Sequence, residues 1–441
     1  MRSAYLAATG LVMAGVLVTG CGQPGTTAGG IATSQSPSAT YARSTPSPSA
    51  THGTGSASAP TAHSSTPESP PTTQPTSSGS SSPSATPRST PPTGGTNEQP
   101  VTVIMNGDLL WHNTLWYGAH EDAVRRGHRG RDDYDFAPLL AGMRPVISAA
   151  DLAICHEEVP LGPRGGPYRN YPIFAAPPQV VAAISSTGYD LCTTSSNHSV
   201  DQGFAGIRRT LDALDRGGIQ HVGTYRSERE SSTPTIFTTK QGVRIAVVSA
   251  TFSLNGLPMP AGKPWAVSRL STQGVLAQAH RARAAGADIV LAALHAGTEY
   301  STTENGQQVA VARALTASPD VDLVYMHHVH VVQPWTRING KWVVFGLGNT
   351  VAQHATDVPR GYEGVTARFT FSKRGGRYLV SKAEYIPTLV THYQPGRPAR
   401  LYQVSAALQT ATGAFRQRLQ AAERRTREVV TRKHPAGLAE G

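Results

Sequence analysis

Seven side chains able to bind a metal ion or to carry a proton follow short apolar runs along the chain. The runs have the composition of buried strands, so the seven side chains lie where predicted strands end. Their donor atoms are oxygen and nitrogen without a thiolate, which is typical of Mn, Fe, Zn or Mg sites and not of a structural zinc site. The seven residues are Asp108, Glu158, Asn197, His198, His295, His328 and His330.

Two of these histidines, His328 and His330, are separated by one residue. Along an extended segment, side chains two positions apart point to the same side, so both imidazoles are expected to reach one metal cluster while His327 faces elsewhere. A lone His-x-His pair is more often structural than metal-binding. Because donor side chains follow five predicted strands, we interpret this pair as metal ligands.

The elements that must position these donors alternate between apolar strand-like runs and amphipathic helical stretches, which predicts an α/β fold with a helix-covered sheet. In such folds ligands bind beyond the carboxyl ends of the strands, where the donors lie. We expect hairpins over 235–251 and 338–346, and further strands over 362–388 in a second sheet or at an edge. The other predicted strands are 101–105, 151–155, 189–193, 220–222, 287–294 and 321–325, and the predicted helices are 136–149, 177–187, 206–216, 271–285, 307–317 and 406–432.

Six segments between residues 101 and 352 resemble, in order and spacing, the CapA family of poly-γ-glutamate capsule biosynthesis proteins. That family is similar to the calcineurin-like metallophosphoesterases, which implies a four-layer α/β/β/α sandwich with a site for two divalent metal ions. The segments are Gly107-Asp108, 151–161 (DLAICHEEVPL), 196–203 (SNHSVDQG), 295–300 (HAGTEY), 327–333 (HHVHVVQ) and 345–349 (FGLGN).

The same resemblance implies a role for each donor. It implies that the second metal is held by Asn197, His295 and His328 and the first by Asp108 and His330, with Glu158 in the place of the bridging acid. His198 would stand beside the metals as the acid that protonates a leaving group or steadies the substrate, and Asp201 would orient it. The expected cofactors are two divalent ions, each Mn, Fe, Zn or Mg.

Two histidines fit the family pattern less closely. Where the family usually has Asn-Leu-Glu this chain has His156-Glu157-Glu158, and where it usually has Gly before the histidines this chain has Met326. His156 is either an additional ligand or a hydrogen-bond donor behind the ligands, or it is a tolerated substitution. His112 follows Asp108 by four residues, where phosphoesterases have a histidine two residues after the aspartate, and it is either a first-metal ligand or a substrate contact.

The first 98 residues differ in composition from the rest of the chain. Residues 1–21 combine one charge, an apolar run and a Val-Thr-Gly-Cys ending that resembles a bacterial lipobox, so we expect a signal peptide and acylation of Cys21. A retained helix and a plain secretory signal are the alternatives. Residues 22–98, dominated by Ser, Thr, Pro, Gly and Ala, predict a disordered tether. The expected location is the extracytoplasmic face of the cell membrane, with a lipid anchor.

The remaining residues are expected to form a CapA-like domain over 99–390 and a C-terminal basic helix over 391–441. The chain has a net charge of +11, and because three basic and two acidic residues precede residue 99, the rest keeps +10. A basic body favours anionic partners such as phosphoesters, polyglutamate or anionic lipid, and no nucleic-acid recognition motif is present. Cys155 and Cys192 are interpreted as small buried apolar residues, with a disulfide between them as the alternative.

Two adjacent divalent ions support hydrolysis, because they activate water and stabilise both the attacking and the leaving oxygen. The resemblance implies poly-γ-glutamate or a related capsule polymer as substrate, and capsule synthase or export components as partners. One alternative is a phosphomonoesterase or phosphodiesterase acting on envelope phosphates. The other is a non-catalytic accessory subunit of a polymer synthase or export complex, against which the full ligand set argues.

Overall fold

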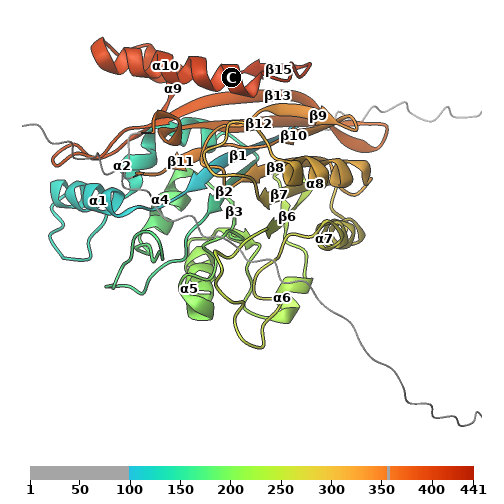
Figure 1. The fold of residues 1–441 in the computed structure, drawn as a ribbon, viewed down its shortest axis with the longest axis horizontal. Helices are drawn as coiled ribbons and strands as arrows, with labels where there is room; N and C mark the ends of the chain where they lie inside the picture. The colour runs from blue at the N-terminus through green and yellow to red at the C-terminus, as the bar shows by residue number, and fades with distance from the viewer. Residues whose placement is uncertain (1–98, 355–357) are drawn as a thin grey trace, which may run out of the picture. The chain divides into compact units, whose positions relative to one another are not determined.

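The computed structural model describes residues 99–354 and 358–441. The predicted signal peptide (1–21) and tether (22–98), Cys21 included, lie outside these residues. Among the helices of the described ranges, none is long and apolar enough to cross a membrane. Residues 99–354 and 358–441 fold around two β-sheets with helices on their outer faces (Figure 1).

The first sheet consists of β1 (Val101–Leu109), β2 (Leu152–Glu157), β3 (Leu191–Thr193), β4 (Gln220–Val222), β11 (Asn349–Val351), β12 (Glu363–Arg374), β13 (Arg377–Val390), β14 (Leu401–Gln403) and β15 (Leu438–Glu440). Its order is β14-β13-β12-β1-β2-β3-β4, with β11 beside β1 and β15 beside β13. Strands β1 to β4 run parallel, whereas β12 is antiparallel to both β1 and β13. The parallel half is the part that delivers donor side chains.

The second sheet consists of β5 (Ile236–Thr238), β6 (Arg244–Thr251), β7 (Ile289–His295), β8 (Leu323–His327), β9 (Trp335–Ile338) and β10 (Lys341–Val344). Its order is β5-β6-β7-β8-β10-β9, and β6, β7, β8 and β10 are parallel. The pairs β5–β6 and β9–β10 are antiparallel, which confirms both predicted hairpins.

Side chains that alternate along the strands fill separate cores on the two faces of each sheet. In β2, Leu152 belongs to the core between the sheets and Ala153 to the core under the first helical layer. In β7, Leu291 faces the first sheet and Val290 faces the second helical layer. The first layer contains α1 (Asn113–Arg125), α4 (Val180–Thr187) and α5 (Gly203–Arg216), and the second contains α7 (Thr272–Ala284) and α8 (Gly306–Ala317). This arrangement confirms the predicted four-layer α/β/β/α sandwich.

Residues 136–149 do not form the single helix that was predicted. They form two short helices, α2 (Ala137–Leu140) and α3 (Arg144–Ile147), joined by a 3-10 turn. Pro145 explains the break, because a proline lacks the N–H that a continuing helix requires and its ring clashes with the preceding turn. The same residue is well tolerated in the first turn of α3, where it lies.

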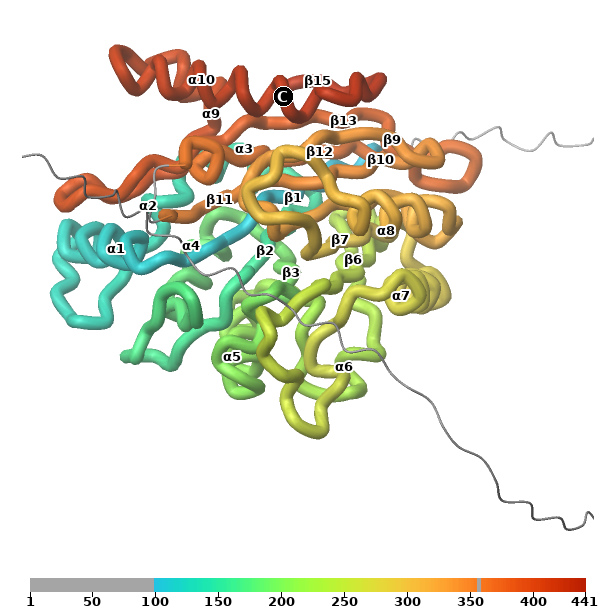
Figure 2. The backbone as a smooth tube through the Cα atoms, viewed as in Figure 1, coloured from blue at the N-terminus to red at the C-terminus, as the bar shows by residue number. Residues whose placement is uncertain are grey.

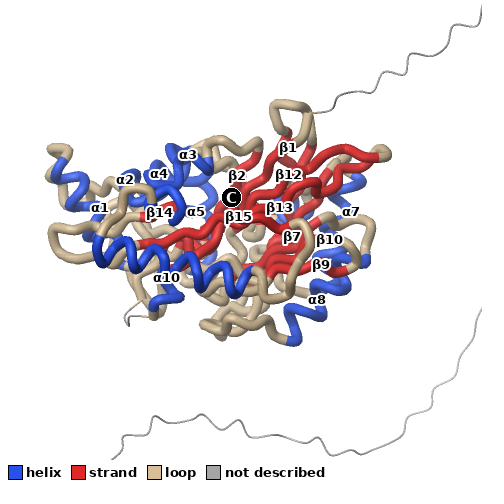
Figure 3. The backbone as a smooth tube through the Cα atoms, turned by 90° about the horizontal axis from the view of Figure 1, so that it is seen from above, coloured by secondary structure: helices blue, strands red, loops and turns tan. Residues whose placement is uncertain are grey.

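The C-terminal part also differs from the prediction. Strands β12 and β13 form neither a separate sheet nor an edge but a long hairpin within the first sheet. Residues 391–441 are not one basic helix, because they contain β14, α9 (Val404–Leu408), α10 (Gly413–Val430) and β15. The interruption lies at Thr412, whose backbone is extended, and at Gly413, whose φ of 57° suits glycine. Figures 2 and 3 show α10 lying along β13, and Val429 and Val430 at the end of this helix belong to the core shared with the second sheet.

Cys155 and Cys192 lie opposite each other on β2 and β3, and their sulfur atoms form a disulfide. The interpretation of both residues as free buried thiols is therefore wrong, and the disulfide alternative is the one present. Both residues are buried. The bond joins β2 to β3 one residue before His156, so it fixes two strand ends that lead into the site.

Candidate metal centre

Strands of both sheets deliver donor side chains to one edge of the body. Asp108 lies near the carboxyl end of β1 and His156 near that of β2, whereas His295 and His327 end β7 and β8. None of the four is more than 2% exposed. The carboxyl ends of parallel strands are where α/β proteins form their sites, and here two sheets contribute to one buried cluster.

Asp108, Glu158 and His330 form one group of donors. Nδ1 of His330 lies 3.2 Å from Oδ2 of Asp108, and its Nε2 lies 3.7 Å from Oε1 of Glu158. One ligand atom from each residue lies within 4.8 Å of the other two. Nδ1 of His330 also lies 2.9 Å from Oδ1 of Asn349 on β11. The structure therefore brings Glu158 together with the two residues implied for the first metal.

Asn197, His295 and His328 lie beside this group. Nε2 of His295 is 2.9 Å from Oδ1 of Asn197 and 3.9 Å from Oε1 of Glu158. The ring centroids of His295 and His328 are 4.9 Å apart. Oε1 of Glu158 thus lies within 4 Å of a histidine from each group.

His327 belongs to the centre, so the expectation that it faces elsewhere is wrong. Its Nδ1 lies 2.9 Å from Oδ1 of Asp108, and its ring stacks on that of His156 with centroids 4.1 Å apart. Asp108, His156 and His327 form a second triad with ligand atoms within 4.8 Å of one another. The two buried triads, which share Asp108, are consistent with a binuclear metal site.

His156 has a protein partner at each ring nitrogen. Its Nδ1 lies 2.8 Å from Oγ1 of Thr193, and its Nε2 lies 3.0 Å from Nδ1 of His295. A contact of this kind to the far nitrogen of a ligand fixes the tautomer and the orientation of the imidazole. Of the alternatives for His156, this geometry fits best the residue that orients a ligand from behind.

The His328-Val329-His330 segment is not extended, contrary to the expectation from its spacing. β8 ends at His327, and the φ angles of His328 and His330 are 89° and 56°. Left-handed backbone at a residue other than glycine costs about 1–2 kcal/mol, and such strain concentrates at functional sites. The two imidazoles reach the centre through a turn of the chain, with ring centroids 6.2 Å apart.

The position of Asp108 depends on a close approach between two glycines. A Cβ atom placed on Gly107 would lie 2.0 Å from the carbonyl oxygen of Gly348. The backbone N–H of Asp108 donates to that same carbonyl at 3.0 Å. The Gly107-Asp108 motif and the FGLGN motif therefore fit together only without a side chain at Gly107.

Several polar atoms of the centre are buried without a hydrogen-bonding partner among the described residues. They are both carboxylate oxygens of Glu158, Nε2 of His327 and Nδ1 of His328, together with Oδ2 of Asp108, which has an ion-pair contact with His330 at 3.2 Å but no hydrogen bond. Burying a carboxylate without compensation is costly, and a bound cation supplies that compensation. The donor set therefore fits divalent cations.

Burial also controls the protonation of the histidines. It lowers the pKa of His156 and of His295 well below the ordinary value and that of His328 to about 4, so these imidazoles are neutral near pH 7. Neutral imidazole is the form that binds a metal. For His330 burial acts in the same direction, but the neighbouring carboxylates, Glu158 first, outweigh it and raise the pKa to about 10. A proton on His330 is the positive charge that a metal ion would replace.

His198 stands at the edge of the centre and is held by Asp201. Its Nδ1 lies 2.8 Å from Oδ2 of Asp201, and the backbone N–H of Phe174 donates to that oxygen at 2.7 Å. The ring of Phe174 packs edge-on against His198 with centroids 4.8 Å apart. Within the described ranges, no hydrogen bond joins the His198 ring to the ligand candidates. Asp201 therefore fixes Nδ1 and leaves Nε2 for another partner.

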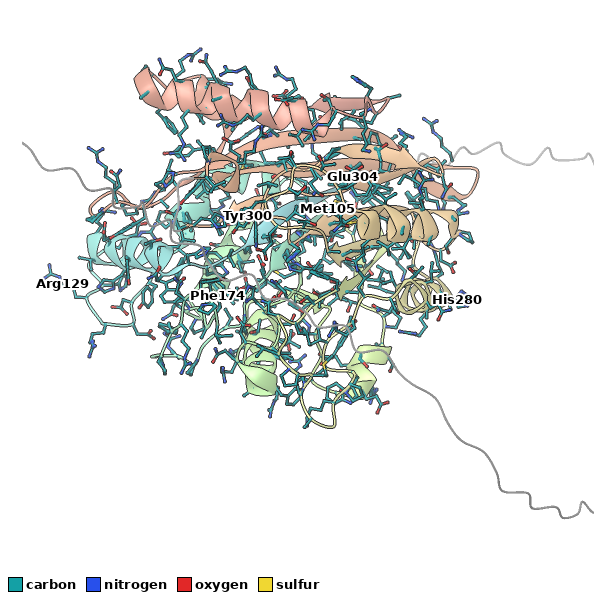
Figure 4. The ribbon with its side chains drawn as sticks, in the orientation of Figure 1. Met105, Arg129, Phe174, His280, Tyr300 and Glu304 are labelled. Atoms are coloured by element: carbon teal, nitrogen blue, oxygen red, sulfur yellow. A yellow bond between two sulfur atoms is a disulfide. The ribbon has the colours of Figure 1, made fainter. Side chains whose placement is uncertain are left out.

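A cavity of about 560 Å³ opens beside the centre, and His198 and His330 lie in its wall. Figure 4 labels Phe174 and Tyr300, which also line it, toward the middle of the body. His112 lines the cavity and does not belong to either triad. Its Nδ1 accepts a hydrogen bond from the backbone N–H of Gln353 at 3.0 Å, and burial lowers its pKa to about 3.

Residues 102–354 match the protein family described as bacterial capsule synthesis protein PGA_cap. The chain belongs to this family. This PGA_cap protein is 26% identical over 215 residues to the PGA biosynthesis protein CapA of Bacillus subtilis, covering 46% of this chain and 52% of that protein. It is 25% identical over 181 residues to the capsule biosynthesis protein CapA of Bacillus anthracis, covering 40% and 43%. The chain thus spans about half the length of the curated relatives it matches.

Solved structures similar to this PGA_cap protein include phosphoesterases. A putative 5'-nucleotidase from Staphylococcus aureus matches with a TM-score of 0.42 and 15% identity, over 74% of this chain and 58% of that chain. The calcineurin-like phosphoesterase YfkN from Bacillus subtilis matches with a TM-score of 0.38 and 14% identity, over 75% and 98%.

Four further residues surround the centre of this PGA_cap protein without having been singled out in the sequence. Oε1 of Glu299 lies 4.0 Å from Nε2 of His328. Tyr300 contacts His354 at 3.4 Å, and His354 contacts the Asn349 amide at 3.0 Å. Glu299, Tyr300 and Asn349 lie within the HAGTEY and FGLGN segments, so motif membership was the available signal. His354 had none.

Proposed function

We propose that this PGA_cap protein is a metal-dependent hydrolase of an anionic capsule polymer of the poly-γ-glutamate type. The observation that carries the proposal is a buried donor cluster that fits two divalent cations, with a cavity of about 560 Å³ beside it. Family membership and the net charge of +10 over residues 99–441 support a polyanionic substrate.

In this proposal two sets of side chains would hold the metal ions. They are Asp108, Glu158 and His330 for one ion and Asn197, His295 and His328 for the other. Two such ions, when bound, activate a water molecule and polarise the bond to be cleaved. The two histidines of the Asp108–His156–His327 triad are assigned to positioning and not to binding an ion. His156 would orient His295 by its contact with Nδ1 of His295, and His327 would orient Asp108 by its contact with Oδ1 of Asp108.

His198 carries the proton that the leaving group needs. Its Nδ1 is engaged by Asp201, so proton exchange with the substrate takes place at Nε2. Cleavage of an amide bond releases a nitrogen that must be protonated, and a histidine beside the cavity is suited to donate that proton. Phe174 packs against the imidazole and limits its rotation.

The test uses the full chain loaded with Mn²⁺, with end-labelled poly-γ-glutamate and an aryl phosphate as parallel substrates. The proposal expects the polymer to shorten, and His198→Ala to slow that reaction strongly. The matched control is His280→Ala, because His280 also contacts an aspartate, Asp320, at 3.1 Å but lies on α7 at the periphery (Figure 4).

Other outcomes of this assay identify the alternatives. Turnover of the aryl phosphate without shortening of the polymer would replace the proposal by hydrolysis of envelope phosphoesters. Bound metal with turnover of neither substrate would indicate an accessory subunit of a synthase or export complex.

We also propose that acylated Cys21, which lies outside the described residues, anchors the protein on the extracytoplasmic face of the membrane. Cys21→Ser is expected to move the protein into the soluble fraction on cell fractionation. An uncleaved variant that stays in the membrane would indicate a retained helix, and a cleaved variant that stays would indicate that the basic body binds the surface itself.

A further inference from the structure

A second cavity, of about 750 Å³, adjoins the one beside the metal centre. The two cavities meet at His392 and Tyr393, which line both. All residues lining the second cavity fall between Thr391 and Arg418, beyond residues 102–354 that match the PGA_cap family. The C-terminal segment therefore adds a recess to the site that the matched region does not build by itself.

The charge of this recess is positive. Arg397 and Arg418 are among its lining residues, which include neither an aspartate nor a glutamate. Within residues 99–354 and 358–441, neither guanidinium is part of an ion pair. By contrast, Arg425, which lies on α10 together with Arg418, pairs with Glu363. The carboxylate that reaches this wall from α1, Glu121, already accepts from Oη of Tyr393 at 2.8 Å and from the backbone N–H of Gly396 at 3.2 Å.

Aromatic side chains link the metal centre to Arg418. The ring centroids of His330 and His354 are 5.8 Å apart, and those of His354 and Tyr362 are 6.0 Å apart. The guanidinium of Arg418 lies 5.8 Å from the Tyr362 ring centroid, a cation–π contact that holds this half-buried side chain in place. The recess thus lies along a continuous wall that starts at a metal-ligand candidate.

Because of where the two arginines lie, a long polymer can contact them and a small ester cannot. Arg397 and Arg418 do not line the cavity that contains His198 and His330. A small ester bound there makes no contact with them, whereas a chain with its reacting bond at the centre can extend into the recess. The recess therefore adds contacts only for a substrate long enough to reach beyond the first cavity and anionic at that distance.

We propose that the recess binds the part of a polycarboxylate chain that extends away from the reacting bond, with Arg397 and Arg418 pairing with its carboxylates. The inference rests on the proposed function, in which a polymer is the substrate. A guanidinium matches a carboxylate with two parallel hydrogen bonds. Tyr402 and Phe415, whose rings pack with centroids 5.1 Å apart, offer apolar surface to the methylene groups between the carboxylates.

The experiment compares long poly-γ-glutamate, γ-linked diglutamate and an aryl phosphate on the full chain loaded with Mn²⁺. Arg397→Gln/Arg418→Gln is expected to raise KM and Kd for the long polymer by about tenfold or more, since two charge-assisted contacts are lost. The kinetic constants for the two small substrates should change by less than about twofold. The matched control is Arg131→Gln/Arg424→Gln, which removes equal charge from two exposed side chains that line neither cavity.

Arg397→Gln alone provides a second test should loss of Arg418 disturb α10, because Arg397 is exposed and its removal leaves the cation–π contact intact. An unchanged KM for the long polymer in both variants, with a wild type that cleaves it, would overturn the recess and leave the proposed function standing. An equal loss in the control would also overturn it, because net charge would then explain the binding.

Two other results would overturn more than the recess. A wild type that cleaves the aryl phosphate but neither binds nor cleaves poly-γ-glutamate would remove the proposed function and the recess together. Arginine-dependent binding of inorganic polyphosphate, without binding of poly-γ-glutamate, would replace the polycarboxylate by a phosphate polymer.

Discussion

Two buried carboxylates of this PGA_cap protein are compensated in different ways. Glu363, on β12 under the C-terminal helix, accepts hydrogen bonds from Nε of Arg425 at 3.0 and 3.1 Å. Glu158, at the metal centre, has no hydrogen-bonding partner within the described ranges for either oxygen. A buried charge needs compensation. Arg425 supplies it to Glu363 through hydrogen bonds, whereas the nearest cationic group to Glu158 is the His330 ring, with Nε2 3.7 Å from Oε1, whose charge a metal ion would replace. The comparison separates charges that hold the fold together from charges that serve a site.

The largest effects are expected from removing a ligand of the metal centre. His295→Ala and Asn197→Ala should lose metal and slow hydrolysis by about 10³-fold or more, because the metal contributes several kcal/mol to stabilising the transition state. High concentrations of added metal should restore part of the rate by mass action. Elemental analysis beside the rate checks this, and full metal content in both variants would show that these residues are not ligands.

His198→Ala should keep its metal and lose rate by about 10²- to 10⁴-fold, the range expected for a general acid. The reason is that His198 contacts Asp201 and Phe174 and makes no hydrogen bond through its ring to the ligand candidates among the described residues. The same metal analysis decides the outcome. A loss of metal as complete as in His295→Ala would mean that His198 is itself a ligand.

Glu157, which is buried beside the centre, extends the comparison to a carboxyl group whose charge depends on pH. Among the described residues, the hydrogen bonds of its carboxyl group come from the indole Nε1 of Trp111, at 2.9 and 3.0 Å. Burial raises its pKa from the ordinary 4.5 to about 8. The folded state therefore holds a proton that the unfolded state releases between these values, so the stability contributed by this group is complete below about pH 4.5 and is lost as the pH rises to about 8.

Glu157→Gln keeps a neutral acceptor for Trp111 and should remove this loss. Its free energy of unfolding should exceed that of the wild type at pH 8 by an amount on the order of a few kcal/mol. Urea unfolding of the metal-free proteins at pH 5, 6.5 and 8 measures the difference. Parallel pH dependences for variant and wild type would mean that Glu157 is ionised in the folded protein.

The smallest effect is expected in the C-terminal layer. Arg425→Met should lower the free energy of unfolding by about 1–3 kcal/mol, because it leaves Glu363 buried without its partner. The half-exposed guanidinium keeps the effect at the low end. Metal content should not change, and the neighbouring exposed control Arg424→Met should be neutral in both measurements. A loss of metal in Arg425→Met would show that the ion pair under α10 also supports the metal centre, contrary to the comparison.

Much of the fold could be predicted because apolar runs in the sequence end in polar residues. β2, β7 and β8 were recognised in this way, and the residues at their ends include donors of the centre. Helix α1 was missed, since its sequence, NTLWYGAHEDAVR, mixes aromatic, polar and charged residues and lacks an N-cap side chain. Its buried face becomes visible only once Leu115 and Trp116 pack in the core.

The parts of the site that could not be predicted depend on backbone conformation and on contacts between distant residues. The spacing of His328 and His330 indicated a shared direction, but the positive φ angles that turn this segment, and that accompany the inward position of His327, have no signature in the sequence. The recess likewise depends on Arg418 meeting Tyr362 across the fold. No local sequence pattern predicts a contact between residues so far apart in the chain.

The central claim is that two divalent ions occupy the edge where β1, β2, β7 and β8 end. Anomalous diffraction from crystals grown with Mn²⁺ tests it most directly. Two peaks are predicted, one within about 2.0–2.3 Å of ligand atoms from Asp108 and His330 and the other equally close to Asn197, His295 and His328. An absence of peaks at this edge, with Mn²⁺ bound only to surface carboxylates or nowhere, would contradict the account.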